Sequence, residues 1–180
     1  MRKPGAALLA GVFLFILLRE PAGARTSVEY AVKAAYLVKF VPFITWPDGV
    51  FSSSSAPLTI CVEGADPFGG SLERAAQGQR DGDHPLAVRR IGASDPATSC
   101  QILFAGGAPD NVAAQIERRK AQPVLTVTDS GVARGGIVSF VVIGDHVRFD
   151  IDEARANAVG IQINSKLLGL AHIVKKNGRP

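Results

Sequence analysis

Apolar residues recur at helical spacing along the stretch Ser27 to Pro47, SVEYAVKAAYLVKFVPFITWP. The spacing predicts an amphipathic helix. Its expected inward face carries Val28, Ala31, Val32, Ala35, Val38 and Val41. Ser27, or Thr26 before it, can cap the first turn by accepting backbone N–H groups. A helix in the protein core is the simpler interpretation of this pattern, and a helix that binds a partner is the alternative.

Polar and aromatic residues refine this helix. Glu29 and Lys33 are spaced i,i+4 in the favourable order and are expected on the outer side. Pro42 has no backbone N–H, so the helix is expected to end or kink near Val41. An aromatic cluster follows, made of Phe40, Phe43, Trp46 and Phe51. A cluster of this density beside an amphipathic helix indicates a sheet that buries part of it.

Short apolar runs bounded by turn residues predict strands over the rest of the chain. The expected strands cover 57–62, 84–91, 100–105, 123–129, 137–143 and 146–151. The expected helices cover 66–77, 110–121, 152–159 and 166–174. Asp66 is expected to cap the first of them, Asp110 or Asn111 the second, and Ser165 the last. Gly144-Asp145 favours a tight turn between the last two strands. The pattern predicts a single α/β domain. Its mixed sheet of about six strands is flanked by helices and ends in a C-terminal antiparallel hairpin.

The first residues are typical of a secretory signal peptide. Arg2 and Lys3 precede the apolar run 6–18, and Ala22-Gly23-Ala24 supplies small residues for cleavage. We expect a signal peptide over 1–24 and the folded domain over 25–180. A retained signal anchor is the alternative. No cysteine lies near the cleavage site, which excludes a lipid-anchored form.

Charge and cysteine content restrict the function further. The chain carries a net charge of +4, and its basic residues are dispersed apart from Arg118-Arg119-Lys120 and Lys175-Lys176. Nucleic-acid binding requires a concentrated basic face, so this distribution does not favour it. The two cysteines, Cys61 and Cys100, both lie in the exported part. An even count in an exported chain predicts a disulfide between them, and two buried free thiols are the alternative.

Signatures of catalysis are missing from the sequence. It has no G-x-S-x-G elbow, no P-loop, no G-x-G-x-x-G and no H-E-x-x-H. The stretch Asp81 to His84 can supply metal ligands, but a polar loop before a strand is the simpler interpretation, and we expect no metal or cofactor. Asp150 and Asp152 share one face of a strand and can act as a carboxylate pair. The simpler prediction is that Asp152 caps the next helix and that Asp150 pairs with Arg148 or solvent.

A small-ligand site can form at the start of the last predicted helix. Asn164, Ser165 and Lys166 place free backbone N–H groups and a cation at that start, where an anion can bind. His172 follows about two turns later. We predict Asn164, Lys166 and His172 as ligand-binding residues, and a simple capping role for Ser165 is the alternative.

Taken in order, several segments resemble the YfiR family. They are AAYLVKFVPFITWP, LTICVEGADPFG, CQILFAG, PVLTVTDS and GGIVSFVVIGDHVRFDIDEARANAVGIQINSKLLGLA, and they extend from Tyr30 to Ala171. The family consists of periplasmic regulators of bacterial cyclic-di-GMP signalling. The resemblance implies a non-enzymatic repressor that binds the periplasmic sensor region of an inner-membrane diguanylate cyclase. It also implies an outer-membrane OmpA-like lipoprotein as a second partner, and a homodimer.

The resemblance leaves alternatives open. Cys61 and Cys100 suit a family disulfide, and any second family disulfide is missing, which favours a structural over a redox role. A periplasmic sensor domain that binds a small molecule and acts on another membrane partner, such as a histidine kinase, is the second interpretation. A hydrolase using Asp150 and Asp152 is the third. We predict the surface that contacts a partner at Phe40, Phe43, Trp46 and Phe51, because aromatic anchors often dominate interfaces.

Overall fold

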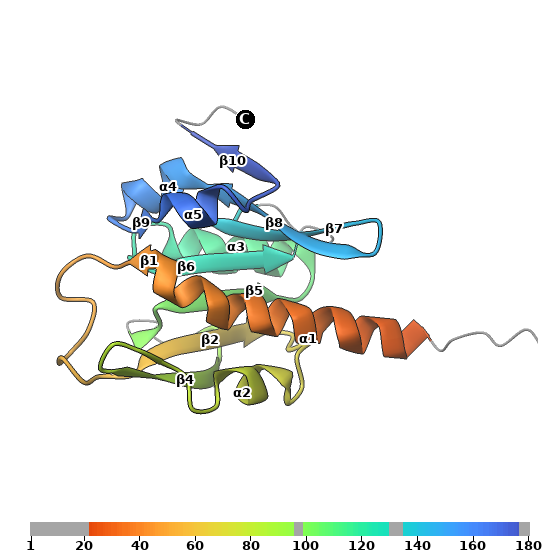
Figure 1. Cartoon of the computed structure of the whole chain (residues 1–180), viewed down its shortest axis with the longest axis horizontal. Coiled ribbons are helices and arrows are strands. Elements are labelled where there is room, and N and C mark those ends of the chain that lie inside the picture. Colours follow the sequence, from red (N-terminus) through yellow and green to blue (C-terminus); the bar gives the residue numbers. More distant parts are fainter. Residues whose placement is uncertain (1–21, 96–98, 130–134, 177–180) are drawn as a thin grey trace, which may run out of the picture.

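The computed structural model describes residues 22–95, 99–129 and 135–176, and their centre is one large β-sheet (Figure 1). Its eight strands lie in the order β10 (Ile173–Lys175), β8 (His146–Asp152), β7 (Val138–Ile143), β6 (Leu125–Asp129), β5 (Ile102–Gly106), β2 (Leu58–Gly64), β4 (His84–Ile91) and β3 (Arg80–Asp81). A separate antiparallel pair joins β1 (Ile44–Thr45) to β9 (Gln162–Ile163).

The sheet is mixed. From β4 through β2, β5 and β6 to β7, neighbouring strands are parallel. β8 runs antiparallel to β7, β10 runs parallel to β8, and β3 runs antiparallel to β4. The predicted single α/β domain with a mixed sheet and a C-terminal hairpin is confirmed. The sheet has eight strands rather than about six because two short strands, β3 and β10, extend its two ends.

Helices lie on both faces of the sheet. α1 (Ala22–Phe40) continues into the 3-10 helix η1 (Val41–Phe43) and crosses one face together with α2 (Ser71–Ala76) (Figure 1). α3 (Pro109–Arg119) lies on the opposite face. We call these the α1 face and the α3 face. Two short helices, α4 (Glu153–Ala158) and α5 (Ser165–Leu168), follow β8.

The connections between parallel strands explain this distribution. The crossover from β2 through α2 to β4 and the crossover from β5 through α3 to β6 move in opposite directions along the sheet. Right-handed crossovers in opposite directions place their helices on opposite faces. Residues 130–137, between β6 and β7, are fewer than the dozen or so that a helical crossover uses.

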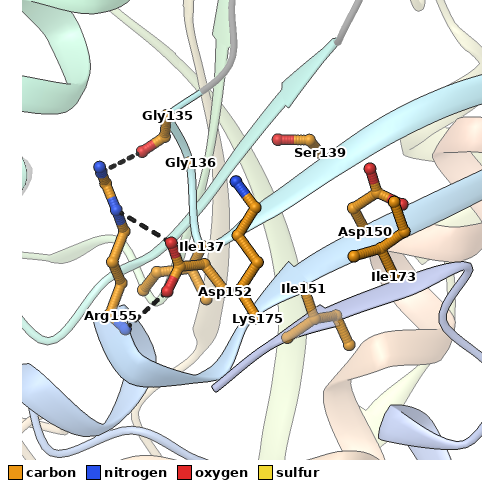
Figure 2. Close-up of a pocket in the computed structure, with 10 residues that line it drawn as sticks. All are labelled: Gly135, Gly136, Ile137, Ser139, Asp150, Ile151, Asp152, Arg155, Ile173 and Lys175. Atoms are coloured by element: carbon orange, nitrogen blue, oxygen red, sulfur yellow. Dashed lines mark hydrogen bonds and ion pairs between the residues drawn. The ribbon is translucent and has the colours of Figure 1, made fainter. Parts of the chain in front are cut away.

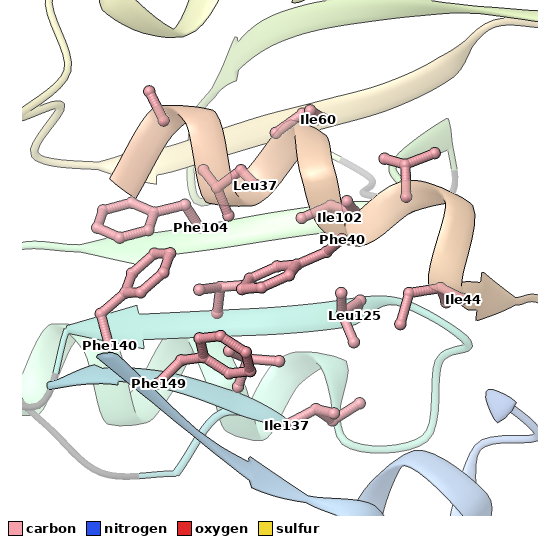
Figure 3. Close-up of a cluster of buried hydrophobic side chains, with 14 of the residues drawn as sticks. Leu37, Phe40, Ile44, Ile60, Ile102, Phe104, Leu125, Ile137, Phe140 and Phe149 are labelled. Atoms are coloured by element: carbon pink, nitrogen blue, oxygen red, sulfur yellow. The ribbon is translucent and has the colours of Figure 1, made fainter. Parts of the chain in front are cut away.

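The main core lies under α1. Leu37 and Phe40 of α1 pack against inward-facing residues of the central strands, including Ile60, Ile102 and Leu125 (Figure 3). Phe40 stacks on Phe140 and meets Phe149 edge-on, with ring centroids 6.1 and 4.9 Å apart. Aromatic pairs in these geometries add to the free energy gained from area burial. The expectation that a sheet buries part of the aromatic cluster is confirmed at Phe40.

The inward face of α1 differs from the prediction. Its buried residues, through the start of η1, are Lys33, Ala34, Leu37, Phe40 and Val41. Val28 is 65% exposed and Val32 is 39% exposed, so only Val41 of the predicted stripe is fully buried. Leu37 and Phe40 offer more apolar area than the small residues of that stripe, and their burial sets the rotation of the helix.

The ends of α1 and α2 test three local predictions. α1 ends at Phe40, beside Pro42, as predicted. Its start at Ala22 places Ser27 inside the helix, so Ser27 does not cap it. α2 begins at Ser71 and not after Asp66. The Asp66 carboxylate instead accepts the backbone N–H of Phe68 at 2.8 Å, in a turn that precedes the helix.

Two later helices also begin or end differently from the prediction. α3 starts at Pro109 after Ala108, without a side-chain cap, so neither Asp110 nor Asn111 has that role. The predicted helix over 166–174 is wrong, because α5 ends at Leu168 and β10 follows. Pairing of β10 with the open edge of β8 satisfies backbone groups that a longer helix would have satisfied internally.

Candidate functional site

Doubly wound sheets usually offer ligands a crevice where the order of the parallel strands reverses. In this protein that place lies between the carboxyl ends of β2 and β5. A Cβ added at Gly64 would lie 2.2 Å from the carbonyl oxygen of Gly106, and one added at Gly106 would lie 2.1 Å from that of Ala65. The two strand ends approach so closely that only glycine fits.

A hollow opens on the α3 face beside β7 and β8 (Figure 2). Its volume is about 150 Å³. Its lining residues are Gly135, Gly136, Ile137, Ser139, Asp150, Ile151, Asp152, Arg155, Ile173 and Lys175. We call it the Gly135 hollow. The Lys175 side chain extends into it between Gly136 and Ser139 (Figure 2).

Most charges around the Gly135 hollow have partners. Asp152 accepts the backbone N–H of Arg155 at 3.0 Å, and its second oxygen lies 3.2 Å from Nε of the same arginine. Nη1 of Arg155 donates to the Gly135 carbonyl at 2.5 Å. The predicted capping role of Asp152 is confirmed. These bonds hold the start of α4 against the segment that leads into β7.

Asp150 also lines the hollow, on the same face as Asp152. Its carboxylate lies 3.0 Å from Nδ1 of His172. The partner side chain is therefore His172 and not the predicted Arg148, while the Asp150 side chain, 22% exposed, also reaches solvent as the alternative predicted. Because one carboxylate is bonded to an imidazole and the other to a guanidinium, the two form separate pairs with other side chains.

The predicted ligand residues Asn164, Lys166 and His172 do not line the Gly135 hollow. The side chain of Asn164 accepts the backbone N–H of Lys166 at 2.9 Å and caps α5, in place of Ser165. His172 follows α5 and pairs with Asp150. A ligand site at these three residues stays a prediction.

The four aromatic residues predicted to contact a partner separate into two groups. Phe40 is 1% exposed and belongs to the core, so the structure removes it from the surface. Phe43, Trp46 and Phe51 are half-buried and pack against that core from its edge. Trp46 donates from Nε1 to the carbonyl oxygen of Gln101 at 3.2 Å. Rings held in this way are rigid, and part of their surface faces solvent.

The Cys61–Cys100 disulfide is confirmed. It joins β2 to the segment before β5, and both cysteines are buried on the α3 face with Ile91, Leu103 and Val124. The bond spans 39 positions in sequence. In the chain-entropy account, closing a loop of that size stabilises the fold by about 4 kcal/mol.

The segment from Asp81 to His84 forms the turn between β3 and β4. Nδ1 of His84 lies 2.6 Å from the carbonyl oxygen of Ala56, and its ring stacks on Phe51 at 3.9 Å. Within the described residues, no three His, Cys, Asp or Glu side chains gather in a way that could hold a metal ion. His84 therefore helps to fix the loop that carries Phe51.

Sequence reasoning missed two buried charge clusters. Lys33 is 1% exposed and lies between Glu29 and Asp129, with Nζ 2.5 Å from the Asp129 carboxylate. Glu63 is equally buried on the opposite face and pairs with Arg118 and Arg119 of α3. The Glu29–Lys33 pair was predicted on the outer side. The structure confirms the pair and corrects its position.

Sequence reasoning also missed the residues that line the Gly135 hollow. The pair Gly135-Gly136 was a signal for them, because it interrupts the apolar pattern just before β7. Exposed apolar side chains were a further omission. They are Val28, Val32, Val142, Ile143, Leu170 and Ile173. Among the described helices, none is long and apolar enough to cross a membrane.

The family comparison accounts for most of the chain. The model of the YfiR/HmsC-like family, DUF4154, matches residues 30–172, from α1 almost to β10. No curated protein matches the chain. The family match supports a periplasmic regulator of the cyclic-di-GMP system. Because this match covers well over half of the sequence, the chain belongs to the YfiR/HmsC-like family.

Proposed function

We propose that this protein is a non-enzymatic periplasmic repressor. It binds the periplasmic sensor region of an inner-membrane signalling protein, a diguanylate cyclase, and lowers cyclic-di-GMP production. The observation that carries the proposal is the family match over residues 30–172. The buried disulfide supports it, because disulfides persist in oxidising compartments such as the periplasm. The predicted signal peptide over 1–24 lies outside the described residues, apart from 22–24.

We place the partner surface at Phe43, Trp46 and Phe51. These side chains are half-buried, and Trp46 and Phe51 meet edge-on with centroids 6.2 Å apart. Aromatic anchors that are already fixed lose little conformational entropy when a partner covers them. The anchors are supported by the Gln101 carbonyl under Trp46 and by the His84 ring against Phe51.

Co-purification tests the proposal. The exported chain is expressed in a periplasm with the sensor regions of membrane cyclases encoded nearby, captured, and scored for complex and for cellular cyclic-di-GMP. We expect a stoichiometric complex and a fall in cyclic-di-GMP when both proteins are present. Absence of a complex with every cyclase, both oxidised and reduced, would overturn the repressor proposal. The same capture, repeated with an outer-membrane OmpA-like lipoprotein and with a second tagged copy, tests the other two predicted assemblies.

A pair of variants tests the surface. Trp46→Ala is expected to weaken the complex about tenfold, the usual loss for an aromatic anchor at an interface. Val142→Ala is the matched control. Val142 is an apolar residue, 49% exposed, in the β7–β8 hairpin, which points away from β1 (Figure 1). Circular dichroism checks that both variants fold. Equal binding by a folded Trp46→Ala protein would remove Trp46 from the interface.

A second function is favoured by the Gly135 hollow. A periplasmic sensor domain that binds a small molecule and acts on another membrane partner, such as a histidine kinase, requires a pocket with charged groups. The hollow offers Lys175, Asp150 and the Asp152–Arg155 pair. The two functions are compatible, because a ligand that prefers one conformation can bias partner binding. Complex formation with a kinase sensor region, and with no cyclase, would favour this second function.

A further inference from the structure

A hollow opens on the α1 face, between η1 and the paired strands β3 and β4. Its volume is about 270 Å³. Its apolar lining residues are Val38, Val41, Pro42, Phe43 and Leu86. We call it the η1 hollow. Val38, Phe43 and Leu86 pack against the main core from its edge and are half-buried, so the hollow offers apolar surface that a partner can still reach.

The polar residues that line the η1 hollow include two cations and no anion. Lys39, Gln79 and Arg80 are exposed and form its rim. Nη2 of Arg80 donates to the backbone carbonyl oxygen of Asp83 at 2.7 Å. Among the described residues, neither Lys39 nor Arg80 forms an ion pair with a carboxylate. The hollow therefore combines an apolar floor with a positively charged rim.

The η1 hollow continues the surface at which we place the partner. Phe43 belongs to both. Leu86 follows His84 by two positions in β4, and the His84 ring stacks on Phe51 at 3.9 Å. Phe51 in turn meets Trp46 edge-on. A partner that covers these aromatic side chains therefore also lies beside the hollow.

The volume of the η1 hollow suits one large apolar side chain. A dry apolar cavity of about 150 Å³ is enough to hold benzene. At about 270 Å³, the hollow has room for a leucine or phenylalanine side chain. Pockets for drug-sized ligands are usually larger and enclose most of the ligand surface. A half-buried wall is more typical of a pocket that receives an anchor residue at a protein interface.

The charges at the rim favour an acidic partner. Lys39 lies in the last turn of α1 and Arg80 in β3, so the two cations come from different elements around the same hollow. Charges around an apolar anchor speed the association of a partner of opposite charge, and they repel a partner of like charge. A segment with carboxylates beside its anchor is therefore favoured over a neutral or a basic one.

We propose that the η1 hollow receives a leucine or phenylalanine side chain from an acidic segment of the partner protein. The apolar side chain packs against Val38, Phe43 and Leu86, and carboxylates next to it pair with Lys39 and Arg80. This inference rests on the proposed function, because it assigns the hollow to the membrane partner. It adds the chemistry that this partner presents.

NMR titration of the isolated protein tests the chemistry with three peptides. Acetyl-Glu-Leu-Glu-amide is expected to bind with a dissociation constant on the order of 1 mM and to shift the backbone amide signals of Phe43 and Leu86. Acetyl-Gln-Leu-Gln-amide lacks the charges and should bind several-fold more weakly. Acetyl-Glu-Gly-Glu-amide lacks the anchor and should bind about tenfold more weakly. No measurable binding of the first peptide, or equal binding of the neutral one, would overturn the proposal.

Two glutamines provide a matched test of the location. Gln79 is exposed and lines the η1 hollow, whereas Gln77 is exposed and does not line it. Gln79→Glu adds a carboxylate at the rim and should weaken binding of acetyl-Glu-Leu-Glu-amide about fivefold. Gln77→Glu adds the same charge two positions away and should leave affinity within about twofold, because solvent and salt screen it. Equal effects of the two substitutions would place the peptide elsewhere and overturn the proposal.

The same two positions test the hollow in the complex with a cyclase sensor region. Gln79→Trp fills part of the hollow with a ring of its own and should weaken the complex about tenfold, the loss expected when an anchor is excluded. Gln77→Trp should bind like the wild type. Circular dichroism checks that both variants fold. Wild-type affinity of a folded Gln79→Trp protein would show that the partner docks outside the hollow.

Failure of this inference and failure of the proposed function give different results. Absence of a complex between the wild type and every cyclase counts against the repressor, and the peptide titration still decides the chemistry of the hollow. A complex that forms while acetyl-Glu-Leu-Glu-amide does not bind leaves the repressor proposal intact and removes the η1 hollow from its interface.

Discussion

The two faces of the sheet each bury one charged residue between two opposite charges. On the α1 face, Lys33 lies between the carboxylates of Glu29 and Asp129. On the α3 face, Glu63 lies between Arg118 and Arg119, and that cluster carries one excess positive charge. Asp129 ends β6 and Glu63 is the penultimate residue of β2, so both clusters lie at the carboxyl edge of the parallel strands.

The clusters differ in how far their outer members reach water. The side chains of Asp129 and Glu29 are 14% and 33% exposed, whereas Arg119 is 7% exposed. Breaking a buried pair is costly because a charge remains in a medium of low dielectric constant. The stability of each cluster therefore depends mainly on its most buried ion pair. The α3-face cluster should therefore be the less tolerant of losing its central charge.

The largest expected effect is that of Glu63→Leu. The substitution leaves Arg119 as a buried cation without a carboxylate, and we expect the free energy of unfolding to fall by about 3–5 kcal/mol. Urea denaturation followed by circular dichroism measures this loss. The double variant Glu63→Leu/Arg119→Met removes the orphaned charge and should recover part of the stability. A loss below about 1 kcal/mol for Glu63→Leu is typical of exposed ion pairs. Such a value would contradict the expectation that the α3-face cluster is the less tolerant of losing its central charge.

Lys33→Met should cost less, about 2 kcal/mol, because the carboxylates it leaves behind are better hydrated. Methionine keeps the shape and the apolar stem of lysine. The substitution also removes the contact between the ammonium group and the ring of Tyr30, where Nζ lies 4.6 Å from the centroid. Urea denaturation of Lys33→Met and of Glu63→Leu under the same conditions compares the two losses of unfolding free energy directly. A larger loss for Lys33→Met would reverse the order of the two clusters.

The sequence allowed the central strands to be predicted, because β2, β5 and β6 are nearly continuous apolar or β-branched runs. The end of α1 was predictable from Pro42, since a residue without an N–H cannot continue the hydrogen-bond ladder. The rotation of α1 was not. Its apolar residues surround much of the helix, so periodicity alone did not distinguish the face with Leu37 and Phe40 from the face with Val28 and Val32.

Lys33 shows why the site could be predicted only in part. A lysine four residues after a glutamate normally forms an exposed pair. Its burial depends on Asp129, which lies 96 positions away in sequence. The pairing of Cys61 with Cys100 was predictable because the chain offers no other cysteines.

The third effect is a pH dependence on the α1 face. The hydroxyl group of Tyr30 donates to Asp129 at 3.1 Å. Burial, followed by the negative charge of Asp129 and that hydrogen bond, raises the pKa of Tyr30 from 10.0 to about 12. A raised pKa means that the unfolded chain loses this proton first. The contribution of Tyr30 to stability is therefore fully present below pH 10 and is lost as the pH rises to about 12.

The comparison of wild type with Tyr30→Phe isolates this contribution, because other groups that ionise in the same range are present in both proteins. The stability advantage of wild type should shrink between pH 10 and 12. Ultraviolet titration of the folded proteins should assign the late-ionising phenol to Tyr30, since the variant keeps only Tyr36. A stability difference that stays constant over this range would show that the Tyr30–Asp129 bond does not couple to folding.

The smallest effects are expected at the outer members of the clusters. Glu29 is 33% exposed and Arg118 is 38% exposed, so each of their pairs is partly screened by water. Glu29→Gln and Arg118→Gln each remove an ion pair, yet each also relieves the repulsion between two like charges that share one opposite charge. The two contributions oppose each other, and we expect each substitution to change the free energy of unfolding by no more than about 0.5 kcal/mol.

Urea denaturation of both glutamine variants, at low and at high salt, tests this balance. The small changes should shrink further at high salt, because the charges concerned are partly solvated. A loss for Arg118→Gln as large as that for Glu63→Leu would show that both arginines are needed to compensate the buried carboxylate. The excess positive charge of this cluster would then be a structural requirement of the α3 face. A near-zero effect would show that the buried Arg119 alone is enough to compensate Glu63.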